Sequence, residues 1–85
     1  MPVHIQEPIS VAVMFEHGRV RPMLFYWKDK KISIDRISFH WQTMEGAAKI
    51  FHFSAVAGGN LYELVFNMTE LTWKLKQIST ESYQT

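Results

Sequence analysis

The 85-residue chain has no cysteine, no long hydrophobic run and almost no net charge. Without cysteine it can form no disulfide and can perform no thiolate chemistry. No apolar run approaches the roughly 18–20 residues that a membrane-spanning helix needs, and the first eight residues do not resemble a secretory signal peptide. These absences predict a soluble protein of the cytoplasm with no membrane partner.

The charge balance restricts the possible partners further. Nine Lys and Arg face eight Asp and Glu, for a formal net charge of +1. A net charge this small cannot by itself hold a strong polyelectrolyte partner. Any nucleic-acid role must therefore depend on a local basic patch. The sequence also lacks a glycine-rich phosphate loop, a convincing pair of carboxylates and a Ser-His-acid set that strand pairing would bring together. It therefore predicts a protein that is not an enzyme and holds no cofactor.

The chain is rich in alternating apolar residues. From Val11 to Leu75 apolar and polar residues alternate, with interruptions at turn-like sites, which is typical of half-buried antiparallel strands. The pattern predicts a single all-β domain over 9–78, preceded by an arm (1–8) and followed by a frayed polar tail (79–85). Six strands are expected, at 9–16, 19–28, 31–43, 48–57, 60–66 and 71–78. Three Trp, six Phe and three Tyr supply a dense core, to which Trp27, Trp41 and Trp73 are assigned.

The turns predict how these strands pair. Gly58-Gly59 favours a two-residue turn, because both central positions of a type I′ turn need positive φ. This turn pairs Ala57 with Asn60 and places Phe53 opposite Leu64. The remaining turns are expected at His17-Gly18, Asp29-Lys30, Glu45 to Ala47 and Asn67 to Glu70, which set Phe15 opposite Val20, Trp27 opposite Ile32, His40 opposite His52 and Phe66 opposite Leu71.

Two breaks in the alternation predict where the sheet bends. One lies near Asp35-Arg36, and the other lies between Pro22 and Phe25. An extra residue in a strand is commonly absorbed as a β-bulge, and neighbouring bulges curl a sheet. We therefore expect a six-stranded antiparallel meander, strongly curled into a small half-open or closed barrel with the aromatic face inside.

A histidine pair is one candidate site. In the predicted register His40 faces His52 across two strands, and Glu63 lies diagonally as a third possible metal ligand. Zinc sites usually present three or four ligands at tight spacing, whereas here only two are adjacent. Two solvated surface histidines are therefore the favoured interpretation, and no metal is expected.

A nucleic-acid surface is the second candidate. Positive side chains and a ring face lie together on the outer side of the predicted sheet, a combination that can follow a phosphate backbone and stack bases. The alternative is that lysines near turns and on edge strands keep a sheet soluble. The residues are Arg21, Tyr26, Lys28, Lys31, His40, Gln42 and Lys74.

A protein interface is the third candidate. Ile50, Val56, Leu61 and Val65 are expected to form an apolar strip on the outer side. Such a strip marks a partner or a self-association surface, although scattered surface hydrophobic residues would give the same pattern. The sequence leaves a monomer and a homodimer open.

The chain contains three motifs: a Pro-x-x-Phe-x-Trp strand from Pro22, a Gly-Gly-x-x-Tyr-Glu-Leu hairpin from Gly58 and a closing Trp-x-Leu strand from Trp73. Together they resemble a small bacterial domain of unknown function, of the kind encoded beside, or fused to, error-prone repair polymerases. The resemblance implies a nucleic-acid or repair-adaptor role and transfers no catalytic residue. The sequence thus predicts a non-enzymatic binding module that uses its outer face for nucleic acid or, alternatively, for protein.

Overall fold

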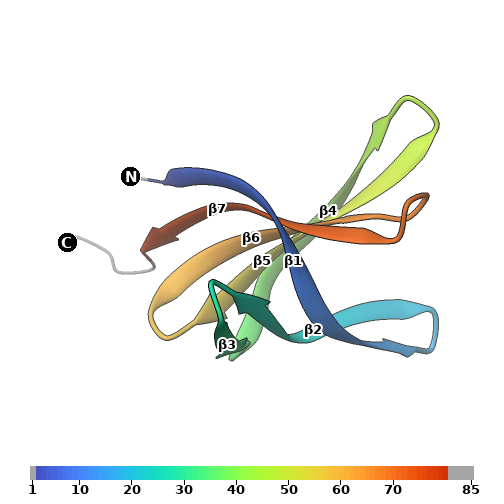
Figure 1. Ribbon diagram of the computed structural model, residues 1–85. Helices are drawn as coiled ribbons and strands as arrows, with labels where there is room; N and C mark the ends of the chain where they lie inside the picture. Colours follow the sequence, from blue (N-terminus) through green and yellow to red (C-terminus); the bar gives the residue numbers. More distant parts are fainter. Residues whose placement is uncertain (1, 81–85) are drawn as a thin grey trace.

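The protein is a single antiparallel sheet of seven strands, described in a computed structural model over residues 2–80 (Figure 1). Among these residues, no helix is long and apolar enough to cross a membrane. The strand order is β3-β2-β1-β7-β6-β5-β4, so β3 and β4 form the two edges. The strands are β1 (Val3–Glu16), β2 (Arg19–Trp27), β3 (Lys30–Ser33), β4 (Arg36–Glu45), β5 (Ala48–Ala57), β6 (Asn60–Asn67) and β7 (Thr72–Thr80).

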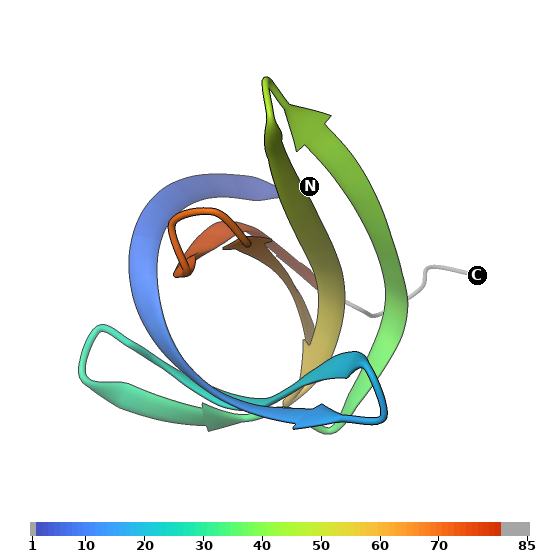
Figure 2. The same cartoon turned by 90° about the vertical axis from the view of Figure 1, so that its right-hand side faces the viewer.

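The all-β antiparallel class is confirmed, but the expected six-stranded barrel is wrong. The sheet is neither closed nor strongly curled, and in the described part of the chain no ladder joins β3 to β4. The predicted strand 31–43 is two strands, because the break at Asp35 is not absorbed as a bulge. Instead Ile34 and Asp35 carry the chain from one edge strand to the other. Figure 2 shows the β4–β5 hairpin and the β2–β3 hairpin extending on different sides of the molecule.

The two ends of the chain contribute more strand than the sequence predicts. Residues 3–8, expected to be an arm, belong to β1, and Val3 pairs with Ile78 of β7. Ser79 and Thr80, assigned to the polar tail, belong to β7, while residues 81–85 of that tail lie outside the described residues. The first half of β1 thus pairs with β7 and the second half with β2, which joins the two halves of the sheet.

The bend predicted between Pro22 and Phe25 is present. Val13 of β1 pairs with Pro22 and the adjacent Ala12 pairs with Leu24, so Met23 is an extra residue in β2. A proline is tolerated beside such a bulge because it cannot donate to a regular ladder. Both Val13 and Phe25 can then point to the same apolar side of the sheet.

Two of the five predicted hairpin registers are correct. Ala57 pairs with Asn60 across Gly58-Gly59, and Phe53 faces Leu64. Phe15 faces Val20 across the first hairpin.

The other three hairpin registers differ from the predicted ones because their turns are formed by other residues than predicted. The β4–β5 turn is Gly46-Ala47, which pairs Glu45 with Ala48. The β2–β3 turn is Lys28-Asp29, both with positive φ (52° and 62°), and it sets Phe25 opposite Ile32. The β6–β7 loop spans 68–71, so Phe66 faces Trp73.

The aromatic core lies on one face of the sheet. The Trp73 ring stacks on Phe66 with centroids 4.7 Å apart and lies 5.8 Å from Phe53. Phe25 of β2 meets Tyr62 of β6 edge-on at 5.1 Å. The buried members of this core are Phe25, Phe53, Ala55, Ala57, Tyr62, Leu64, Phe66, Trp73 and Leu75.

Replacing Gly59 by L-alanine is expected to lower the free energy of unfolding by about 1–2 kcal/mol. Gly59 has φ +81°, and a Cβ there would meet no atom within 4 Å, so the cost comes from the backbone alone. Urea unfolding measures it. D-alanine at the same position, introduced by chemical synthesis, is the matched control and should not destabilise. Equal losses for the two enantiomers would contradict the backbone explanation.

Candidate functional site

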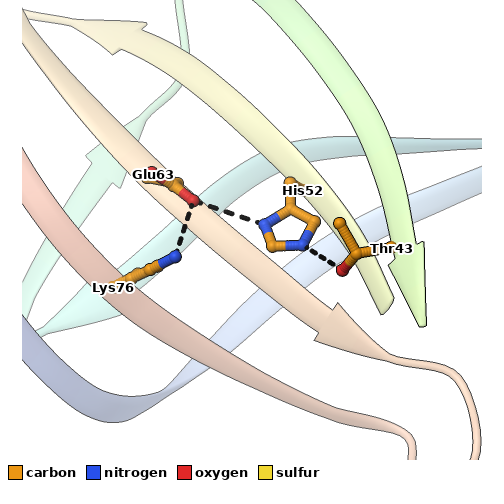
Figure 3. A network of polar contacts seen from close by, with 4 residues as sticks. All are labelled: Thr43, His52, Glu63 and Lys76. Atoms are coloured by element: carbon orange, nitrogen blue, oxygen red, sulfur yellow. Dashed lines mark hydrogen bonds and ion pairs between the residues drawn. The ribbon is translucent and has the colours of Figure 1, made fainter. Parts of the chain in front are cut away.

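Four polar side chains form a connected network (Figure 3). Its His52 is next to the core residue Phe53 in β5 and therefore lies on the face of the sheet opposite the aromatic core. Thr43 Oγ1 lies 2.8 Å from His52 Nε2. His52 Nδ1 lies 3.3 Å from Glu63 Oε2, and the Lys76 ammonium lies 3.6 Å from the same oxygen. The network therefore connects β4, β5, β6 and β7.

His52 is the buried centre of this network. Its side chain is enclosed, the residue being 8% exposed, and the Trp41 ring stacks on it with centroids 4.9 Å apart and planes 8° apart. When Nδ1–H donates to the Glu63 carboxylate, Nε2 accepts the Thr43 hydroxyl proton, so both ring nitrogens of a neutral imidazole are satisfied. Every buried side-chain polar atom of the described residues has a hydrogen-bond partner.

The sequence misses this network. Hydroxyl, imidazole and carboxylate stand in the order found in acyl-transfer sites, but the predicted β4–β5 register was displaced by one residue and hid the Thr43–His52 contact. The signal was Gly46, which has positive φ and marks the first residue of the turn. Because the imidazole is enclosed and its nitrogens are bound to its neighbours, we interpret the network as a polar link between strands.

The predicted histidine pair is wrong. His40 pairs with Phe53 rather than with His52, so the two imidazoles lie on opposite faces of the sheet. The predicted proximity of His52 and Glu63 is correct. Among the described residues, no group of three or more His, Cys, Asp and Glu side chains could hold a metal ion.

Three of the seven predicted nucleic-acid residues share one face by strand register, and a fourth, Lys28, lies in the adjoining β2–β3 turn. Tyr26 pairs with Lys31 of β3 on one side and with Ser10 of β1 on the other. Two residues before Ser10, Pro8 pairs with Lys74 of β7, so all these side chains share the outer face. We call Tyr26, Lys28, Lys31 and Lys74 the tyrosine–lysine face.

The tyrosine–lysine face borders an open hollow. The hollow has a volume of about 590 Å³ and is lined by Pro8, Ile9, Ser10, Tyr26, Lys28 and Asp29. Tyr26 is 49% exposed. The Lys28 ammonium lies over the Trp27 ring, 5.1 Å from its centroid, and remains at the surface. Asp29, in the turn of the β2–β3 hairpin, is the acidic residue that lines this hollow.

The other three predicted residues lie elsewhere. Arg21, His40 and Gln42 line a separate hollow of about 480 Å³ between the β1–β2 hairpin and the β4–β5 hairpin. The Arg21 guanidinium lies 3.2 Å from the Glu16 carboxylate, so part of its charge is neutralised. The predicted set is thus two groups rather than one surface.

The predicted apolar strip is largely inaccessible. Ile50 and Val56 are buried, while Leu61 and Val65 are half-buried. β5 lies between β4 and β6, so its outer side chains are flanked by neighbours on both sides, as Trp41 flanks His52. Within residues 2–80, the large apolar residues that are exposed lie elsewhere, at Val3, Met14, Phe15, Met23, Tyr26, Phe39, Met44, Met68 and Leu71.

Comparison of the chain with protein-family models, with curated proteins and with solved structures gave no match. The resemblance to a domain encoded beside repair polymerases therefore stays a prediction, and we infer the function from the tyrosine–lysine face and the hollow at Arg21.

Proposed function

We propose that the protein is a non-enzymatic, cytoplasmic module that binds single-stranded nucleic acid on its tyrosine–lysine face. One observation carries the proposal. Strand register puts an exposed aromatic ring, Tyr26, on the same face as Lys31 of β3 and Lys74 of β7, and Lys28 lines the adjoining hollow from the β2–β3 turn.

The composition of this face matches the chemistry of single strands. An exposed ring can stack on an unpaired base, and lysines beside it contact the phosphates that flank that base. Tyr26 is about half exposed and lies between Ser10 and Lys31, so its ring face is open to a planar ligand. A base in a duplex is already stacked on both sides, so the ring favours single strands over duplexes.

The charge of the tyrosine–lysine face also favours this face, rather than the hollow at Arg21, as the nucleic-acid site. At that hollow, which Arg19 also lines, Glu16 partly neutralises Arg21. On the tyrosine–lysine face, no ion pair among the described residues involves Lys28, Lys31 or Lys74. The resemblance noted in the sequence favours the same class of ligand.

Charge reversal at Lys28 and Lys31 is expected to weaken binding to a short oligo-dT by about tenfold or more, because two phosphate contacts become repulsive. The affinity of the Lys28→Glu/Lys31→Glu variant is measured by fluorescence anisotropy. Chemical shifts of the wild-type amides on adding the oligonucleotide should change most at 8–10, 26–31 and 74.

A matched control reverses two exposed cations elsewhere. The Arg19→Glu/Lys49→Glu variant has the same net charge as the first, but its changes lie at the start of β2 and on β5. It should bind oligo-dT nearly as tightly as the wild type, apart from the general effect of net charge. If this control lost more affinity for oligo-dT than the lysine variant, the binding site would lie at the hollow at Arg21 and the proposal would be overturned.

A further inference from the structure

The two edges of the sheet differ in how they are protected from pairing. β3 is four residues long and carries Lys30 and Lys31, and short lysine-bearing edges resist the addition of another strand. β4 is ten residues long and contains neither lysine nor proline. Its charges, Arg36 and Glu45, stand at its two ends. Its one irregularity, at Ser38, lies near one end.

Large apolar side chains also remain exposed along β4. Phe39 is 64% exposed and Met44 is 60% exposed. Phe39 lies beside Trp41 on one face, with ring centroids 5.4 Å apart. An unprotected edge with exposed apolar side chains is where a further strand is expected to add.

The hairpin geometry identifies the backbone groups that point outward. Glu45 and Ala48 flank the two-residue turn Gly46-Ala47, and residues closing such a turn hydrogen-bond to each other. The ladder then alternates along the strand, so His40, Gln42 and Met44 direct their N–H and C=O groups away from β5. In the described part of the chain, no strand pairs with this side.

We propose that β4 pairs antiparallel with β4 of a second copy of the chain, about a two-fold axis at Trp41. A two-fold axis perpendicular to a sheet pairs each residue with one on the same face. Because the bulge skips Ser38, Arg36 shares a face with Phe39, Trp41 and Glu45. The resulting cross-copy pairs are Arg36 with Glu45, Ile37 with Met44, Phe39 with Thr43, His40 with Gln42, and Trp41 with itself.

This register is self-complementary. It sets a cation against an anion at both ends of the paired strands and apolar Ile37 against Met44. β4 carries a cation at one end and an anion at the other. Because the second copy runs in the reverse direction, each charge meets its opposite, and a second copy therefore fits this edge. The tyrosine–lysine face lies towards the other edge, on β2, β3 and β7, so the dimer leaves it open and the inference is independent of the proposed function.

The experiment measures the mass of the intact chain by sedimentation equilibrium over a concentration series. The wild type is expected to form a dimer that dissociates on dilution. Its His40, Gln42 and Met44 amides should gain protection from hydrogen exchange as the concentration rises. A Gln42→Pro variant removes one outward N–H while sparing the ladder to β5, and is expected to be monomeric throughout.

Charge variants test the register. Glu45→Arg sets cations opposite each other at both ends and should weaken the dimer about tenfold. The swap Arg36→Glu/Glu45→Arg should restore it. Glu70→Arg makes the same charge change in the β6–β7 loop and should leave the dimer intact.

Three results would overturn the proposal: a wild type monomeric up to about 1 mM, a dimer that survives Gln42→Pro, or equal weakening by Glu45→Arg and Glu70→Arg. The second result would place a dimer on another surface, and the first would exclude a second copy as the occupant of the edge. Circular dichroism confirms that each variant is folded.

Discussion

Replacing Trp73 by alanine is expected to lower the free energy of unfolding by about 3–5 kcal/mol, the usual cost of removing a buried large aromatic side chain. The Trp73 ring is buried between Phe66 and Phe53, which come from β6 and β5. The vacated space could not close without moving both strands. In a domain of this size such a loss is a large part of the total stability. Urea unfolding followed by far-ultraviolet circular dichroism measures the change.

The matched control is Phe15→Ala. Phe15 is also a large aromatic residue in a strand, but it is 65% exposed, so its removal should change the stability by only about 0.5 kcal/mol. If the two variants were equally destabilised, the assignment of the aromatic core to one face of the sheet would be wrong.

Replacing His52 by leucine is expected to cost about 1–3 kcal/mol, although leucine is apolar and of comparable size. The substitution removes the donor that satisfies the Glu63 carboxylate, leaving that carboxylate with Lys76 at 3.6 Å. The Thr43 hydroxyl also loses its partner. The cost arises mainly from a carboxylate that stays enclosed with one partner fewer, because its desolvation is no longer compensated.

His40→Leu is the control for this prediction. His40 lies in the adjacent strand and is exposed, and its ring contacts Phe53. Its replacement should change the free energy of unfolding by only about 0.5 kcal/mol. A double variant, His52→Leu/Glu63→Leu, should recover part of the loss, because it removes the unsatisfied carboxylate. A His52→Leu protein as stable as the wild type would contradict the polar link.

The sequence predicts the strands better than it predicts their arrangement. Alternation locates most of the strand residues, although it merges β3 with β4 and misses the first half of β1. Gly58-Gly59 fixes one hairpin because glycine accepts positive φ without strain. The Lys28-Asp29 turn was missed because two non-glycine residues take positive φ there. The open sheet was missed for a related reason. A phase break such as Asp35 is compatible both with a bulge and with the end of a strand, and only the partners of the flanking residues distinguish the two.

The same limits apply to the candidate sites. Tyr26, Lys28 and Lys31 are neighbours in one hairpin, and the predicted and observed β2–β3 registers differ by two residues, which keeps Tyr26 and Lys31 on the same face. Arg21 and His40 come from β2 and β4, which lie towards opposite edges of the sheet. Their positions relative to each other therefore depend on long-range strand pairing. The His52 network needed the β4–β5 register to be correct to the residue, because a shift of one residue moves every side chain to the other face.

The salt dependence of oligonucleotide binding tests the central claim most directly. If Lys28, Lys31 and Lys74 each neutralise one phosphate, the slope of log K against log salt concentration should be about −2 for a single strand. The Lys28→Glu/Lys31→Glu variant should lose most of that slope along with its affinity. Binding that is absent at low salt, or a slope that is the same in the wild type and the variant, would contradict the tyrosine–lysine face as a nucleic-acid site.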